Sequence, residues 1–150
     1  MSELLRLIAL DAEDLAIISA NLQDACVKIR DMTYLPRAKR FALVASRFDW
    51  VAAAEGRNER CRAGLHFERV LKATCTGLAQ DAKDECLSLL SVSYKVTDAP
   101  GGHVTLTFSG GAAVRLEVEC LEAQIADIGP RWPAKSCPDH KFDEAATRAS

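Results

Sequence analysis

The stretch Arg60-Cys-Arg-Ala-Gly-Leu-His-Phe-Glu68 alternates apolar residues with polar or small ones at every step. A period of two is typical of a β-strand with one face in the core and the other in solvent. Four side chains are therefore expected to point inward: Cys61, Ala63, Leu65 and Phe67. The alternation breaks at Glu68-Arg69, which predicts a kink before a further extended segment at residues 70–76.

The same period recurs along most of the chain. Further strands are expected around residues 27–29, 41–48, 90–96, 104–108 and 114–118. Turn-forming residues separate several of them, as in Pro36–Lys39, Asp98–Gly102 and Ser109–Gly111. Short connections of this kind join antiparallel neighbours, so the pattern predicts a mainly antiparallel sheet of six to eight strands. Such a sheet could curl into a partial barrel.

The last of these turns allows a prediction of strand register. A two-residue turn would set Leu106 opposite Arg115 and place charge on the apolar face. A three-residue loop at residues 110–112 avoids this conflict and pairs Phe108 with Val114. The outer face of that arrangement pairs His103 with Glu119.

Helical spacing appears at the N-terminal end. Leu4 to Leu10 is apolar and predicts a buried strand, after which Asp11 can cap a helix that runs to about Asp24. Residues 118–128 fit either a second helix or a continued strand, and Ala52–Asn58 is expected to be a loop. The fold class is therefore α+β, with the N-terminal helix packed on the sheet.

Length and composition indicate one folded domain. The chain has 150 residues, 49% of them hydrophobic and 27% charged, which is ordinary for a globular protein. We expect a single domain over residues 1–133 and a loose polar tail over 134–150. No export signal or membrane span is recognisable, so a cytoplasmic protein with six reduced cysteines and no disulfides is expected.

Charge is distributed unevenly although the net charge is only −2. Residues 28–72 carry eleven Lys or Arg against five Asp or Glu, a local charge of +6. Within this segment Arg60, Arg62 and His66 share the outward face of the predicted strand. They form a candidate anion-binding face, to which three further cations could contribute: Arg37, Arg40 and Arg57.

Sequence signatures of catalysis are absent: no phosphate-binding loop, nucleophile elbow, HExxH helix or dinucleotide fingerprint occurs. The predicted cross-strand pair of His103 and Glu119 is an alternative acid–base site. Cys137-Pro-Asp-His140 offers two ligands where zinc needs three or four, so no metal is expected. Neither is any cofactor.

Several motifs together resemble one protein family. They are Leu7–Leu15, Leu22–Ala25, Arg40–Val44, Arg47–Trp50, Gly64–Val70 and Gly110–Cys120. Their combination is similar to a small bacterial family catalogued as domain of unknown function 2948, over roughly residues 4–133. The resemblance implies a cytosolic bacterial protein and one intact domain. It brings no activity, cofactor or catalytic residue with it.

Three classes of function follow, in order of preference. The first is a non-enzymatic binding or interaction module whose Arg-rich face contacts an anionic group on a partner protein or small ligand. The second is a small cofactor-free enzyme that uses a strand histidine as general base. Nucleic-acid binding through residues 28–72 ranks last, because the net charge is negative and few aromatic residues lie among the arginines. No membrane contact is expected.

Overall fold

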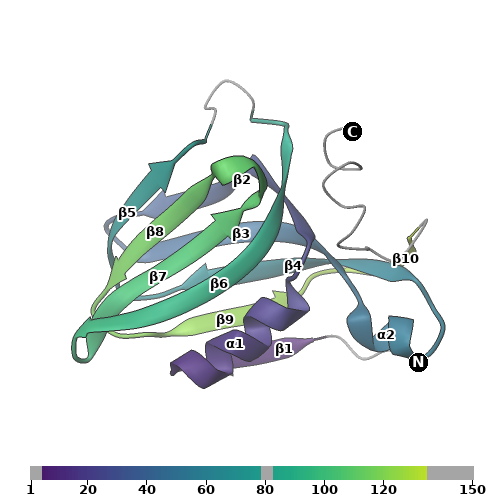
Figure 1. The fold of residues 1–150 in the computed structure, drawn as a ribbon, viewed down its shortest axis with the longest axis horizontal. Helices are drawn as coiled ribbons and strands as arrows, with labels where there is room; N and C mark the ends of the chain where they lie inside the picture. The colour runs from purple at the N-terminus through teal and green to yellow at the C-terminus, as the bar shows by residue number, and fades with distance from the viewer. Residues whose placement is uncertain (1–4, 79–82, 135–150) are drawn as a thin grey trace.

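The alternating segments pair into one antiparallel sheet (Figure 1). The structure is a computed structural model that describes residues 5–78 and 83–134. Its elements are β1 (Arg6–Ala9), α1 (Ala12–Asn21), β2 (Ala25–Leu35), β3 (Arg40–Phe48), α2 (Trp50–Ala54), β4 (Glu59–Phe67), β5 (Val70–Thr76), β6 (Cys86–Asp98), β7 (Gly101–Phe108), a 3₁₀ turn (Ser109–Gly111), β8 (Ala113–Val118), β9 (Ala123–Asp127) and β10 (Trp132–Pro133).

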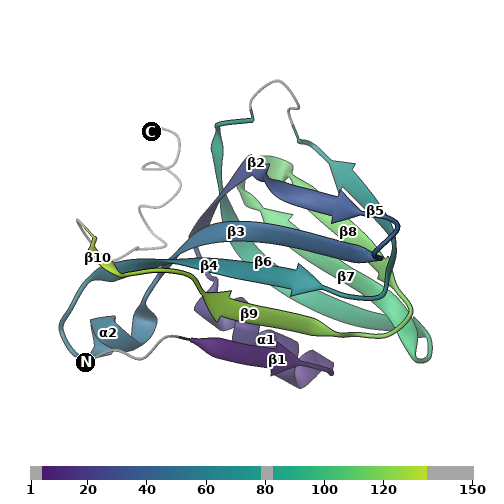
Figure 2. The same ribbon diagram turned by 180° about the vertical axis from the view of Figure 1, so that it is seen from behind.

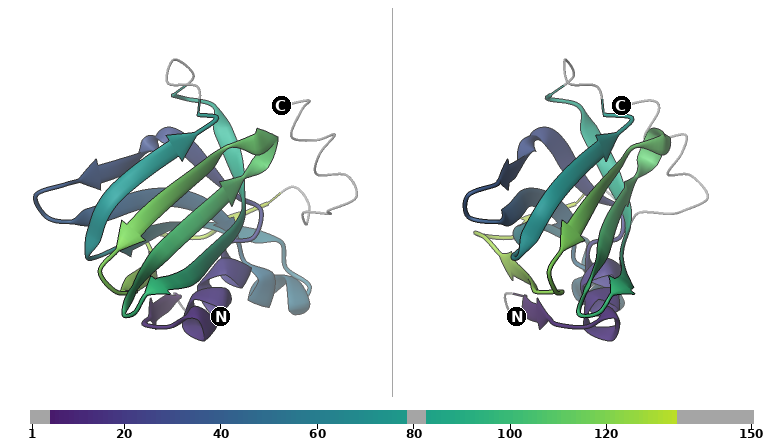
Figure 3. Two further views of the ribbon diagram at one scale, coloured as in Figure 1. Left: turned by 60° about the vertical axis from the view of Figure 1, so that its left-hand side comes forward. Right: turned by 90° about the vertical axis from the view of Figure 1, so that its left-hand side faces the viewer.

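The sheet is strongly curled but not closed. Its strand order is β1-β9-β4-β3-β2-β6-β7-β8-β5, and the short β10 pairs with β4. Register shifts interrupt β2, β5 and β6, and such irregularities bend and twist a strand. The bending brings β5 beside the β2–β3 hairpin (Figure 3), where the Val70 N–H donates to the Lys39 carbonyl at 2.8 Å.

The core fills the concave side of this sheet. On β4 the four residues predicted to point inward are all buried, and the alternation is confirmed. The kink also lies where it was predicted, because Arg69 adopts a positive φ of 60°. Inward-facing residues of β3, β7 and β8 complete the core, among them Phe41, Leu106 and Leu116.

The N-terminal helix closes one end of the curled sheet by packing against β6 and β1 (Figure 1). Its apolar stripe, Leu15, Ile18 and Leu22, is buried as predicted. The Ser19 hydroxyl accepts a hydrogen bond from the Val92 N–H at 2.9 Å, which ties the helix to β6. The predicted N-cap is also present, since the Asp11 carboxylate accepts the Asp14 N–H at 2.8 Å.

Replacing Asp11 with Ala should lower the free energy of unfolding by about 1 kcal/mol, because the N–H of Asp14 loses its acceptor. Urea denaturation followed by circular dichroism measures the change. Glu13→Ala, in the same exposed turn but outside the cap, is the matched control and should stay within about 0.5 kcal/mol of the wild type. Equal losses in both variants would contradict the capping role.

Several predicted elements need correction. The described residues form ten strands rather than six to eight, so the fold is more sheet-dominated than α+β implies. Of the two alternatives left open for residues 118–128, the structure has the strand, at residues 123–127. The expected buried strand at residues 4–10 is an exposed edge strand in which Ile8 is 61% exposed. The expected loop after β3 begins with α2, whose first turn is capped by Asp49.

The predicted register of the β7–β8 hairpin is wrong by two residues. Leu106 pairs with Val114 and Val104 with Leu116, because the chain makes a 3₁₀ turn before β8 begins. Gly110 and Gly111 both have positive φ in this turn, which only glycine adopts readily. A shift of two preserves the face of every side chain, and therefore the apolar faces still meet.

The cysteines also differ from expectation. Cys26 on β2 and Cys86 on β6 lie at disulfide distance, with Cα atoms 5.6 Å apart. This placement contrasts with the expectation of no disulfides, whereas Cys61, Cys75 and Cys120 are free. Cys137 and the rest of the predicted tail from residue 135 lie outside the described residues. Neither helix in the described part is long and apolar enough to cross a membrane.

Candidate functional site

The outward residues of β4 belong to a wider surface on the convex side of the sheet. Cross-strand partners share a face, so the pairs Arg6–Ala126, Ala126–Gly64 and Gly64–Val44 form one continuous row. A parallel row runs from Ile8 through Gln124 and His66 to Ala42. No described element covers these rows (Figure 2).

We call this surface the convex face; it comprises Arg6, Ile8, Ala42, Val44, Arg62, Gly64, His66, Gln124, Ala126 and Ile128. The exposed side of an antiparallel sheet is ordinarily polar. Here the centre is apolar and made of small side chains, while Ile8 and Ile128 are 61% and 49% exposed. Apolar patches with a polar rim often mark contact sites.

Gly64 leaves room for the Ile128 side chain above β4. A Cβ atom at Gly64 would lie 3.0 Å from the Cδ1 atom of Ile128. Ile128 is held beside β4 because its N–H donates to the Arg62 carbonyl at 2.6 Å. The space above the glycine is thus taken by the Ile128 side chain, which becomes part of the exposed apolar surface.

Two cations of the convex face carry uncompensated charge. Arg6 and Arg62 are both exposed, and neither forms an ion pair with another residue of 5–78 or 83–134. Arg62 lies beside Ile128, and Arg6 lies on the edge strand β1, two residues from Ile8. Arg62 therefore lies at one end of the apolar centre, beside Ile128, and Arg6 lies at its β1 edge, beside Ala126.

His66 takes part in a charged cluster at the end of β4. Its Nδ1 atom lies 2.8 Å from Oε2 of Glu68, which also accepts a 2.7 Å hydrogen bond from Nε of Arg40. Partial burial would raise the pKa of Glu68, but the hydrogen bonds from Arg40 and His66 outweigh it and hold that pKa below its usual value. Arg40 is accordingly already paired with an acid.

The remaining predicted cations do not gather around Arg62. Arg60 donates to the Ser46 carbonyl at 2.9 Å, and Arg57 pairs with Glu55 and Glu59 in the loop before β4. Arg37 is exposed in the β2–β3 turn. Arg60, Arg62 and His66 share one strand face. Most of the six predicted cations, however, already pair with acids or donate hydrogen bonds to carbonyl oxygens.

The alternative acid–base pair of His103 and Glu119 does not form. Because the hairpin register is shifted, His103 lies across from Glu117, with Nε2 and Oε1 3.6 Å apart. Its Nδ1 atom contacts Arg115 instead. Glu119 pairs with Lys39 at 2.6 Å.

A buried charge network, which was not predicted from the sequence, lies at one end of the core. Arg47 of β3 is 3% exposed and forms two hydrogen bonds of 2.8 Å with the Asp127 carboxylate of β9. Asp127 also accepts the Leu5 N–H at 2.7 Å. Nearby, Arg131 donates to Asp49 at 2.7 Å.

This network stabilises the fold and does not favour nucleophilic chemistry. Burial would raise the pKa of Asp127, yet the hydrogen bonds from Arg47 and Leu5 dominate and lower it. Burial raises the pKa of the neighbouring Cys61 thiol, and Asp127 raises it further, so the thiolate is disfavoured. Arg47 and Asp127 both occupy inward-facing positions in the alternation of their strands, and this pattern could have revealed the pair.

Fold and surface together define a small curled-sheet protein with an exposed apolar face that is bordered by two cations without an ion pair among the described residues. The chain belongs to the family described as a protein of unknown function, DUF2948, whose sequence model matches residues 5–140. The predicted resemblance is thereby confirmed. No curated protein and no solved structure matches the chain. Among the described residues, no cluster of three or more His, Cys, Asp or Glu could hold a metal.

Proposed function

We propose that the protein is a non-enzymatic interaction module that binds a partner protein through the convex face. The observation that supports this most strongly is the exposed apolar centre flanked by Arg6 and Arg62, neither of which is paired within the described residues. The partner segment is apolar at its centre and carries Asp or Glu on both sides. Its carboxylates meet the two guanidinium groups, and its apolar residues cover Ile8 and Ile128.

A protein segment fits this surface better than a small ligand does. Small molecules bind in concave sites that enclose most of their surface, whereas this face is convex. A second copy of the chain is also a poor partner. A two-fold contact would bring one cation-bearing patch against an identical one, and like charges repel.

The proposal predicts which peptides the protein selects. A random peptide library displayed on phage is panned against the purified chain. Enriched peptides should combine a central apolar residue with flanking acids. Arg62→Glu should weaken their binding by about ten-fold or more, because an attraction is replaced by a repulsion at the rim. Ile128→Asp should weaken binding by a similar factor, since it places an acid within the apolar centre.

Lys72→Glu is the matched control for charge, because Lys72 is an exposed cation on β5, away from the convex face. Its peptide affinity should remain close to that of the wild type. Enrichment of peptides without acids, equal binding by the Arg62→Glu variant, or no enrichment at all would contradict the proposal. Fluorescence anisotropy with one synthesised peptide provides the affinities.

A further inference from the structure

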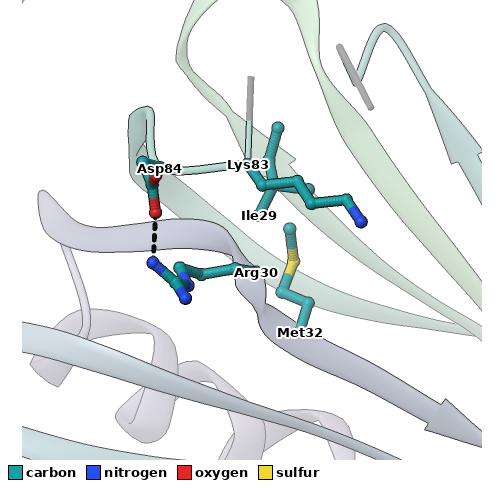
Figure 4. A pocket seen from close by; sticks show the side chains of 5 residues that line it. All are labelled: Ile29, Arg30, Met32, Lys83 and Asp84. Atoms are coloured by element: carbon teal, nitrogen blue, oxygen red, sulfur yellow. Dashed lines mark hydrogen bonds and ion pairs between the residues drawn. The ribbon is translucent and has the colours of Figure 1, made fainter. Parts of the chain in front are cut away.

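A second candidate site lies where β2 separates from β6. The two strands pair only over Ala25–Lys28 and Cys86–Leu89, after which β2 turns away toward β3. The separation leaves a cavity of about 550 Å³, within the range of about 300–1,000 Å³ typical of ligand sites. It is lined by Ile29, Arg30, Met32, Lys83 and Asp84 (Figure 4).

The cavity residue Met32 points to the concave side of the sheet, away from the convex face. Met32 pairs with Leu43 and Tyr34 with Phe41, so both side chains point inward. They are nevertheless only half-buried and pack against the edge of the core. Because β2 and β6 do not pair beyond Lys28, Ile29 and Met32 border an open cavity rather than a sealed interior.

The polar groups at the mouth have unequal roles. Arg30 forms an ion pair with Asp84, and the Arg30 N–H donates to the Lys83 carbonyl at 3.1 Å, which anchors Lys83 to β2. The Lys83 side chain extends past Ile29 and over Met32 (Figure 4). Its ammonium group has no ion pair within 5–78 and 83–134. The cavity thus combines two apolar side chains, Ile29 and Met32, with the Arg30–Asp84 ion pair and one cation that has no ion pair among the described residues.

We infer that this cavity binds a single-chain amphiphile with a carboxylate head, of the size of a medium-chain fatty acid. The alkyl chain lies between Ile29 and Met32, where its methylene groups leave water. The carboxylate pairs with the Lys83 ammonium at the rim. Arg30 stays paired with Asp84 and holds the wall in place.

The Met32 side chain, which lines the cavity, provides the test. Methyl-labelled methionine in the full-length protein is followed by NMR while decanoate is added below its micelle concentration. The Met32 methyl signal should shift saturably. Decanol, which has the same chain length without the charge, should bind more weakly.

Lys83→Gln should weaken decanoate binding by about five-fold, as expected for a partly exposed ion pair, and should leave decanol binding unchanged. Lys95→Gln, at an exposed lysine on β6, is the matched control and should have no effect on either ligand. A Met32 signal that does not move, or decanoate affinities that are equal in wild type and Lys83→Gln, would overturn the inference. Neither result bears on the convex face, which contains none of the cavity residues.

Discussion

Replacing Asp127 with Ala should lower the free energy of unfolding by about 3–5 kcal/mol. The change leaves the Arg47 guanidinium, 3% exposed, without its carboxylate partner. It also removes the acceptor of the Leu5 N–H at the start of β1. Urea denaturation of wild type and variant measures the loss. An isolated buried charge lowers the stability of the fold, because the low-dielectric interior does not compensate for the hydration that the charge loses.

Asp84→Ala provides the comparison, because Arg30 and Asp84 form an exposed pair that should contribute less than about 1 kcal/mol. The double variant Arg47→Met with Asp127→Leu should recover most of the loss, since well-packed apolar residues can replace a buried ion pair. Equal losses of unfolding free energy in Asp127→Ala and Asp84→Ala would contradict a stabilising role for the buried ion pair.

The same carboxylate predicts a pH dependence. The pKa of Asp127 is lower in the folded protein than its ordinary value, as are the pKa values of Asp49 and Glu68. Carboxylates of this kind stabilise the fold above their unfolded pKa, and this stability is lost as pH falls through the folded pKa. Stability should therefore be retained near neutral pH and decline below about pH 4. The Asp127→Ala variant should lose less on acidification than the wild type does.

Phe67→Ala should also destabilise the fold by about 3–5 kcal/mol. Phe67 is fully buried and pairs across strands with Phe41 on one side and Ala123 on the other. Truncation leaves a cavity between three central strands that are too well paired to collapse into it. Chemical denaturation monitored by circular dichroism gives the free energy.

Arg62→Ala is the control on the opposite face of the same strand and should remain within about 0.5 kcal/mol of wild type. The contrast tests the alternation of β4 directly. Comparable losses from both variants would mean that the outward face is also structural. A stable Arg62→Ala variant also ensures that lost peptide binding in Arg62 variants is not caused by unfolding.

Local pattern was sufficient to predict most of the strands and the first helix. The period of two in β4, β7 and β8 depends on neighbouring residues only, and the N-cap at Asp11 depends on one turn. Strand pairing depends on loop geometry. The predicted register of β7 and β8 was therefore wrong by two residues. The exposed position of Leu90 has a similar cause, because a bulge in β6 interrupts the expected alternation.

The site could be predicted only in part. The alternation predicted that Arg60, Arg62 and His66 share one face. It did not indicate which of the cations would pair with acidic residues. Arg40 and Glu68 lie 28 residues apart, and Arg47 and Asp127 lie 80 apart. The apolar centre of the convex face likewise joins β1, β3, β4 and β9, which become neighbours only through the sheet order.

The most direct test of the convex face is an isoleucine-methyl NMR titration of the protein with a selected acidic peptide. The methyl signals of Ile8 and Ile128 should shift as the peptide binds, because both side chains lie on the exposed surface. Ile125 should not respond, since it is buried on the inward side of β9, and Ile29 should not respond either, since it lines the separate cavity. Saturable shifts at Ile29 or Ile125 with none at Ile8 and Ile128 would contradict the proposed interaction surface.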